Sequence, residues 1–360
     1  MAVKRLLLRS AGGVVALAVL VSGYLWLHGD FRRWDDAAKL DAACDGLLDP
    51  AVMREVLGDG EVGVREWDGT AHHVRCEVVV DGGGKADVRV ADETAIGVAG
   101  FEPFLGGRER GLAVPVGNGW SGLFGADSGD EDETEGVTTA FTLHCTAGEA
   151  KTIMVTLRAE LFDERPVDDP ANRPAYTRIA EATARKVSEV RGCEAELGDK
   201  VRSVPLPVRE DEYEPLDEAD GTCAGIEPLR GVRTVLETAR DGAPYERCRL
   251  LDADRLRRYG LEASFGTYAQ SFFRGNRASY EDDLPTGRVP AHHRARDESV
   301  SWTTAKCPEG TALFTLVAYG RHDDKTSALV SGDLAQERAA LKIFAERSAE
   351  SHGCRPPKAP

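Results

Sequence analysis

The chain has 360 residues, enough for two domains of ordinary size, and 42% of them are hydrophobic, so each domain can bury a core. Its formal net charge of −16 at pH 7 disfavours nucleic acid and anionic membrane surfaces as partners, because both attract basic patches. An acidic surface of this kind keeps an exported protein dispersed in solution.

The first feature along the chain is an uncharged apolar run, Ala11–Leu27, which basic residues precede. As a helix it would span roughly 25 Å, the short end of what a bilayer requires. Tyr24 and Trp26 lie at its far end, where aromatic side chains favour the membrane interface. We therefore expect a cytoplasmic tail at residues 1–10, an uncleaved transmembrane signal-anchor at 11–28 and an extracytoplasmic body. A cleaved signal peptide is the alternative, although no small-residue cleavage site is evident.

All of the cysteines follow this apolar run, and an even number of cysteines in an exported chain predicts disulfides. The eight predicted disulfide residues are Cys44, Cys76, Cys145, Cys193, Cys223, Cys248, Cys307 and Cys354. No C-x-x-C pair occurs, so neither thioredoxin-type redox chemistry nor a zinc site has support.

The spacing and the flanks of the cysteines indicate an internal duplication. The first four are separated by 32, 69 and 48 positions and the last four by 25, 59 and 47. The stretches that begin at Cys44 and Cys223 align without a gap as far as Leu57 and Leu236. An arginine precedes the second cysteine of each set, and a glycine precedes the fourth.

We therefore predict two tandem four-cysteine repeats, at residues 35–204 and 221–356. An acidic, proline-rich stretch at 205–220 is predicted to link them. Pairing within each repeat is the simplest disulfide scheme, and three connectivities remain open in each. We favour first with second and third with fourth.

Hydrophobic periodicity predicts that each repeat is α+β, an antiparallel sheet with an N-terminal and a C-terminal helix packed on it. The opening helix of the first repeat follows Cys44 and stops at Leu57-Gly58. The predicted hairpins pair Cys76–Val80 with Ala86–Val90, Thr138–Cys145 with Thr152–Leu157, and Ser301–Lys306 with Ala312–Tyr319. The closing helices contain the apolar stripes Tyr176–Val190 and Leu334–Ala345, the second with Asp333 as its N-cap.

Two long polar segments, Gly125–Gly136 and Gly275–Glu298, are predicted to be loops and are candidates for partner contacts. Within the first, Asp127, Asp130 and Asp132 lack the spacing of a calcium-binding loop.

Other motifs also lack the surroundings that their function requires. Gly117–Gly122 fits the dinucleotide-binding pattern G-x-G-x-x-G, but an acidic segment follows it, which would repel a pyrophosphate. The adjacent histidines in His72-His73 and His292-His293 would point to opposite faces of a strand and cannot easily chelate one ion. We assign no catalytic, cofactor-binding or metal-binding residue. We expect Trp67, Trp120 and Trp302 to be core residues. We expect Arg75 and Arg247, which precede the second cysteine of each repeat, to be surface residues.

The motif Cys44-x-x-Leu47-Leu48, continued by Val56-Leu57-Gly58 and the later cysteines, resembles exported domains of unknown function in actinobacterial lipoproteins and membrane-anchored proteins. The resemblance implies a cell-envelope accessory or binding domain and supplies no catalytic residue. This chain departs from it in its duplication, its long acidic loops and the absence of a cysteine at the end of the apolar run.

From these observations we expect a membrane-tethered, single-pass extracytoplasmic protein that binds a protein or an envelope ligand without catalysis. Two alternatives remain open. One is a cell-envelope hydrolase that uses dispersed carboxylates, and the other is the ectodomain of a sensor or assembly complex.

Overall fold

The computed structural model describes residues 30–70, 72–96, 111–127, 136–162, 166–240, 242–275, 298–319 and 334–358. Within these ranges the chain forms five α-helices and two antiparallel sheets. The predicted signal-anchor lies outside them, as do His292-His293, Asp333 and most of both polar loops. Among the described helices none combines the length and apolarity needed to cross a membrane.

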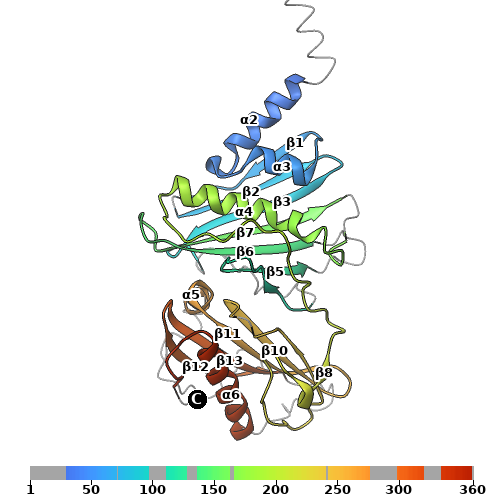
Figure 1. The fold of residues 1–360 in the computed structure, drawn as a ribbon, viewed down its shortest axis with the longest axis vertical. Coiled ribbons are helices and arrows are strands. Elements are labelled where there is room, and N and C mark those ends of the chain that lie inside the picture. The colour runs from blue at the N-terminus through green and yellow to red at the C-terminus, as the bar shows by residue number, and fades with distance from the viewer. Residues whose placement is uncertain are drawn as a thin grey trace, which may run out of the picture.

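The first sheet has seven strands in the order β1-β2-β3-β7-β6-β5-β4, and α2, α3 and α4 pack on one of its faces (Figure 1). Its strands are β1 (Val62–Glu66), β2 (His73–Val80), β3 (Gly84–Asp92), β4 (Val114–Pro115), β5 (Gly122–Asp127), β6 (Gly136–His144) and β7 (Thr152–Leu161). The helices are α2 (Asp30–Gly46), α3 (Pro50–Leu57) and α4 (Arg173–Val190). The backbone leaves the helical conformation in the last turn of α2, from Ala43 to Asp45.

The second sheet has six strands in the order β12-β13-β11-β10-β9-β8. They are β8 (Glu214–Pro215), β9 (Thr234–Glu237), β10 (Tyr245–Leu251), β11 (Arg257–Ser264), β12 (Glu298–Cys307) and β13 (Gly310–Tyr319). Helix α6 (Leu334–Ser351) packs on one face of this sheet, and α5 (Gly266–Gly275) packs on the other through a cluster that includes Trp302. A short 3₁₀ turn, η1 (Leu216–Glu218), follows β8.

Alternation of side chains along the strands produces the layers. In β2 every second residue from Val74 to Val80 is buried beneath the helices, as the period of two in a half-covered strand predicts.

Asp49 accepts hydrogen bonds from the backbone of Ala51 and Val52 and so caps α3, while Gly58 ends it with a positive φ of 101°.

The favoured disulfide connectivity is confirmed. Cys44 pairs with Cys76, Cys145 with Cys193, Cys223 with Cys248, and Cys307 with Cys354, and no cysteine is free. Three of the bonds join the end of a helix to a strand or to the residue that follows one, so the helix layer and the sheet are covalently linked, and the bond of Cys223 joins a turn to β10.

The predicted hairpins and closing helices are confirmed, but the predicted opening helix of the second repeat is wrong. Residues after Cys223 form turns, and the stretch that aligns with α3 runs into strand β9. Gly225 and Gly231 have positive φ angles of 81° and 82°, and Pro228 lies between them, so a helix cannot propagate there. The loop predicted from Gly125 is also shorter than expected, because β5 continues to Asp127.

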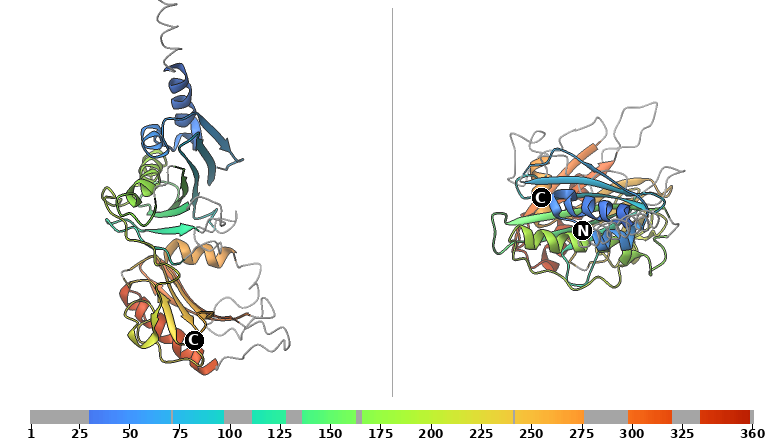
Figure 2. Two further views of the ribbon diagram at one scale, coloured as in Figure 1. Left: turned by 90° about the vertical axis from the view of Figure 1, so that its right-hand side faces the viewer. Right: turned by 90° about the horizontal axis from the view of Figure 1, so that it is seen from above.

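The two sheets meet through α5 (Figures 1 and 2). Tyr268 of α5 stacks on Tyr245 of β10, with ring centroids 6.0 Å apart, and both belong to an apolar cluster that includes Ala140 and Met154 of the first sheet. The predicted linker is ordered as well, since Val208 pairs with Leu112 and residues 214–215 form β8. The halves are therefore in direct contact.

Removing the bond between Cys145 and Cys193 is expected to destabilise the first half. The free energy of unfolding of the double variant Cys145→Ala/Cys193→Ala should be about 3–4 kcal/mol lower, because the unfolded chain gains the conformational entropy of the loop that this bond closes. Urea denaturation of the full chain under non-reducing conditions measures the difference. An unchanged midpoint would show that this bond does not constrain the unfolded state.

Candidate functional site

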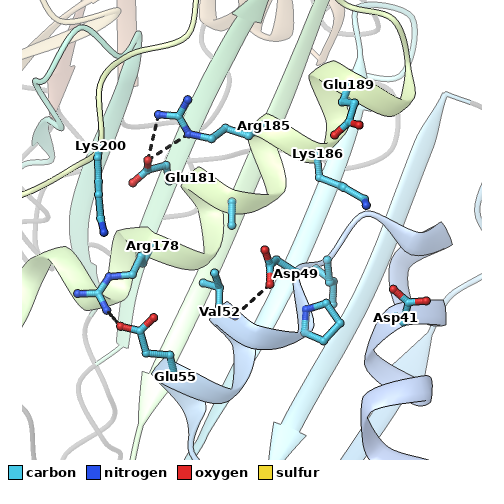
Figure 3. Close-up of a pocket in the computed structure, with 13 residues that line it drawn as sticks. Asp41, Asp49, Val52, Glu55, Arg178, Glu181, Arg185, Lys186, Glu189 and Lys200 are labelled. Carbon is cyan, nitrogen blue, oxygen red and sulfur yellow. Dashed lines mark hydrogen bonds and ion pairs between the residues drawn. The ribbon is translucent and has the colours of Figure 1, made fainter.

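A groove of about 520 Å³ lies between α3 and α4. Figure 3 shows it between the two helices, with Asp41 of α2 at one end. Its floor is apolar and is formed by Leu48, Pro50, Val52 and Ala182. A groove that combines an apolar floor with polar walls is suited to hold a ligand in a fixed orientation.

Two ion pairs fix the walls of this groove. Arg178 of α4 reaches across to Glu55 of α3. Arg185 binds Glu181 one turn earlier on α4 at 3.0 Å, and it also donates to the carbonyl oxygen of Gly198 at 2.7 Å. These ion pairs shape the walls of the groove.

Four other charged side chains of the groove have no partner among the described residues. They are Lys186, Lys200, Asp41 and Glu189. Figure 3 shows Lys186 and Glu189 toward the α2 end and Lys200 toward the other end. The groove thus offers unpaired charges of both signs beside an apolar floor. That chemistry suits an extended ligand with apolar and charged groups of both signs, such as a peptide segment.

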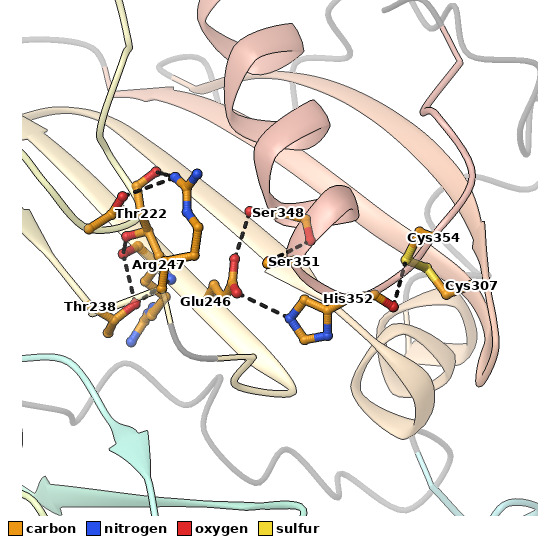
Figure 4. Close-up of polar contacts among 11 residues, drawn as sticks. Thr222, Thr238, Glu246, Arg247, Cys307, Ser348, Ser351, His352 and Cys354 are labelled. Atoms are coloured by element: carbon orange, nitrogen blue, oxygen red, sulfur yellow. Dashed lines mark hydrogen bonds and ion pairs between the residues drawn. A yellow bond between two sulfur atoms is a disulfide. The ribbon is translucent and has the colours of Figure 1, made fainter.

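The second half contains a buried polar network instead of a groove. Glu246 of β10 is fully buried and accepts from Ser348 Oγ at 2.6 Å and from His352 Nε2 at 3.1 Å (Figure 4). The imidazole of His352 also stacks on Phe265, with ring centroids 3.5 Å apart. In a serine hydrolase the imidazole lies between the serine and the carboxylate. Here the carboxylate lies between the other two, and Ser348 is buried, so the network supports packing and not nucleophilic attack.

A trio of carboxyl groups lies at the edge of the second sheet. One oxygen from each of Glu214, Asp220 and Glu237 falls within 4.8 Å of the others. Glu237 already accepts from the backbone N–H groups of Asp220, Gly221 and Cys223, so it stabilises the turn that precedes β9. Burial, followed by the hydrogen bond and charge of Glu237, raises the pKa of Glu214 to about 7.

The structure separates most of the residues that the sequence singles out. Trp120 and Trp302 are core residues as predicted, whereas Trp67 is half-buried beneath the guanidinium of Arg75. Gly117–Gly122 forms a turn after β4 and runs directly into strand β5 instead of a helix.

The two described histidines of the adjacent pair have different surroundings. His72 contacts Asp92 through Nδ1 at 2.6 Å, while His73 lies in β2 opposite Ala91. His72 lies in the turn before β2, so the strand geometry expected for the pair applies to His73 alone.

The two arginines that precede Cys76 and Cys248 are not simple surface residues. Arg75 pairs with Asp87 at 2.8 Å, and Arg247 lies 3.5 Å from Glu262. Each is also placed over an aromatic ring, Arg75 over Trp67 and Arg247 over Tyr245. Sequence reasoning missed these contacts and the groove, because both depend on pairings between strands and helices that are distant in the chain.

Comparison with known proteins gives no family. No protein-family model matches the chain, and no curated protein matches it. Two solved structures align over most of its length. DynU16, from the dynemicin biosynthetic locus, is 14% identical with a TM-score of 0.17 and covers 86% of this chain and 91% of its own. The di-domain ARO/CYC StfQ of the steffimycin pathway is 9% identical with a TM-score of 0.17 and covers 87% and 94%. At these scores neither likeness carries an argument about fold or function.

The raised pKa of Glu214 predicts a pH-dependent stability. The folded chain holds this proton more tightly than the unfolded chain, whose carboxyl has the ordinary value of 4.5, so the free energy of unfolding should fall as pH rises from about 4.5 to 7. Because Glu214 is only partly buried, we expect a contribution of about 1 kcal/mol. Glu214→Gln should remove this part of the pH dependence.

Urea denaturation of both proteins at a series of pH values measures the effect. Glu212→Gln, an exposed residue of the same segment, is the matched control and should keep the slope of the unaltered chain. Equal slopes for the Glu214→Gln variant and the unaltered chain would contradict the assignment.

Proposed function

We propose that this chain is a non-catalytic binding protein, tethered to a membrane and exposed to an oxidising compartment, that holds its ligand in the α3–α4 groove. The groove is the observation that carries the proposal, since it places unpaired charges of both signs over an apolar floor. The pairing of all eight cysteines supports the location, because disulfides persist outside the reducing cytosol. The apolar run Ala11–Leu27 supplies the tether in this proposal.

The proposal includes a duplication of one module. In each half the second cysteine lies directly opposite a glutamate of the preceding strand: Cys76 faces Glu66 and Cys248 faces Glu237. Each of these glutamates also accepts from the backbone N–H of the first cysteine of its half. Two unrelated domains have no reason to share this combination of register, disulfide and hydrogen bond.

The ends of the modules also agree. Helices α4 and α6 both have 18 residues, and each is followed by a glycine with positive φ, Gly192 and Gly353. The next residue in each case is a cysteine whose N–H donates to a carbonyl five residues earlier, at 2.8 Å. This is the same helix-ending motif in both halves.

The strand pairing aligns the two halves differently from the gapless alignment that the sequence suggests. The glutamate that accepts from the first cysteine lies 22 positions after that cysteine in the first half and 14 positions after it in the second. The difference equals the eight residues of α3. Helix α3, one wall of the groove, is thus an addition to the first copy, and the second copy keeps the module without it. We assign ligand binding to the first copy on this ground.

The same proposal relates the chain to the exported four-cysteine domains of actinobacterial envelope proteins. Of the alternatives, the hydrolase would need a free carboxylate pair in a cleft, and in the carboxyl trio found among the described residues Glu237 is already held by backbone N–H groups. The sensor or assembly role is a special case of binding, in which the ligand of the groove is a membrane partner.

The tether and the compartment can be tested in intact cells. We expect the full chain to fractionate with membranes and to resist alkylation by a membrane-impermeant maleimide until it is reduced from outside. Non-reducing peptide mapping should return the four bonds within the halves. Recovery of free thiols from freshly lysed cells would contradict an oxidising location.

The groove can be tested with a photoreactive residue at Val52, on its floor. Irradiation of cells should give an adduct of defined mass, whereas the same residue at Arg65, an exposed position on strand β1, should not. Binding of the identified ligand to the purified chain should weaken by roughly tenfold in Lys186→Glu, because a charge-assisted contact becomes repulsive. Equal adducts at both positions, or unaltered binding by the variant, would contradict the assignment.

A further inference from the structure

The face of the first sheet that points away from its own helices carries, beside the part that α5 covers, a concentration of positive charge that the fold does not require. The charged residues come from strands β1, β2, β3 and β7. The cations are Arg65, Arg75, Lys85, Arg89 and Arg158, and the carboxylates are Glu77, Asp87 and Glu160. In a chain with a net charge of −16, this face has more cations than anions.

The charge is most concentrated in one row across the sheet. Arg75 of β2 lies directly opposite Arg89 of β3, and Arg89 lies directly opposite Thr156 of β7. Direct partners in antiparallel strands place their side chains on the same face, and like charges in such a pair destabilise a sheet. The two guanidinium groups share a single carboxylate, Asp87, which contacts Arg75 at 2.8 Å and Arg89 at 3.0 Å.

One carboxylate between two guanidinium groups leaves a net positive charge. Burial alone would raise the pKa of Asp87, but the hydrogen bonds from Arg89 and Arg75 outweigh it and hold the pKa below its usual value, so Asp87 is ionised. The neighbouring carboxylates have cations of their own: Glu77 contacts Lys85 at 3.0 Å, and Glu160 contacts Arg158 at 3.5 Å. They do not neutralise the arginine pair.

Hydrogen-bonding groups in the same row also lack partners. Thr156 is buried, and its Oγ1 has no hydrogen-bond partner among the described residues; the same holds for Nε of Arg75. Buried polar groups without a partner cost stability and call for an explanation. The guanidinium groups remain reachable from solvent, since the side chains of Arg75 and Arg89 are 33% and 32% exposed.

The second half provides an internal comparison. There Arg247 occupies the position of Arg75, next to the second cysteine, and its direct partner across the strands is Glu262. The module therefore accommodates a neutral arginine–glutamate pair at the place where the first half has two arginines. The additional charge of Arg89 is specific to the first half and is not a requirement of the fold.

We propose that Arg75 and Arg89 form a binding site for an oxyanion, the carboxylate or phosphate group of a ligand, on the face of the first sheet that points away from its helices, with Thr156 buried beside them. A guanidinium group matches both anions. Trp67 lies against Arg75 at 4.2 Å and restricts its orientation. The site is separate from the α3–α4 groove, which lies on the helix-covered face of the sheet.

The test uses the purified full chain in detergent, titrated by calorimetry with inorganic phosphate and, separately, with acetate at constant ionic strength. We expect saturable binding of at least one of them, and the preferred anion identifies the ligand group. Arg89→Glu copies the arrangement of the second half and should weaken binding by more than tenfold without loss of folding. Arg65→Gln, on the same face but outside the row, should change it less than twofold.

A second readout distinguishes a local site from general screening. Burial, followed by the charges of Arg89 and Arg75, lowers the pKa of His73, so its imidazole is neutral at pH 7. An anion bound at the pair would shift the NMR signals of this imidazole, whereas sodium chloride at the same ionic strength would not. If Arg89→Glu fails to fold, Arg89→Gln replaces it. Absence of binding by both anions, equal losses in the Arg89 and Arg65 variants, or an unaffected His73 would overturn the proposal.

Discussion

One strand of each half, β2 in the first and β10 in the second, is anchored twice to the segment in front of it, and the rest of each half depends on this anchor. A disulfide joins the first cysteine to the second, which lies on β2 or β10. A glutamate opposite the second cysteine accepts from the N–H of the first. The covalent bond fixes the distance, and the carboxylate satisfies a backbone donor that would otherwise be left unpaired. With this edge held, the strands that follow can pair in one register only.

The same anchor tolerates large changes in the segments around it. Helix α3 stands between the first cysteine and the glutamate in one half, and a turn with two glycines of positive φ stands there in the other. Because the anchor fixes both ends of this segment, its length and conformation can vary while the sheet stays the same. The groove is a consequence of this freedom, since one of its walls is the variable segment.

Sequence patterns predicted the elements whose stability is local. The hairpins around Gly82–Gly84 and Glu309-Gly310 are confirmed, because alternation and turn residues are properties of neighbouring positions. The opening helix of the second half was predicted wrongly, because aligning Leu57 with Leu236 ignored the effect of Gly225, Pro228 and Gly231 on the backbone. The groove charges and the arginine row could not be predicted, since Lys186 and Lys200 line one groove, and Arg75 and Thr156 share one row, only when elements far apart in the chain pack together.

Helix α5 gives the two halves a shared interior. Tyr268 faces the first sheet, while Ala269 and the adjoining phenylalanines cover Trp302 and Leu313 of the second. A cut in the segment between the halves would therefore not release them, because each would expose an apolar face that the other now covers. A rotation of one half relative to the other would break the packing of Tyr268 against Ala140 and Met154, so the proposed ligand sites of the first half would keep a fixed orientation relative to the second.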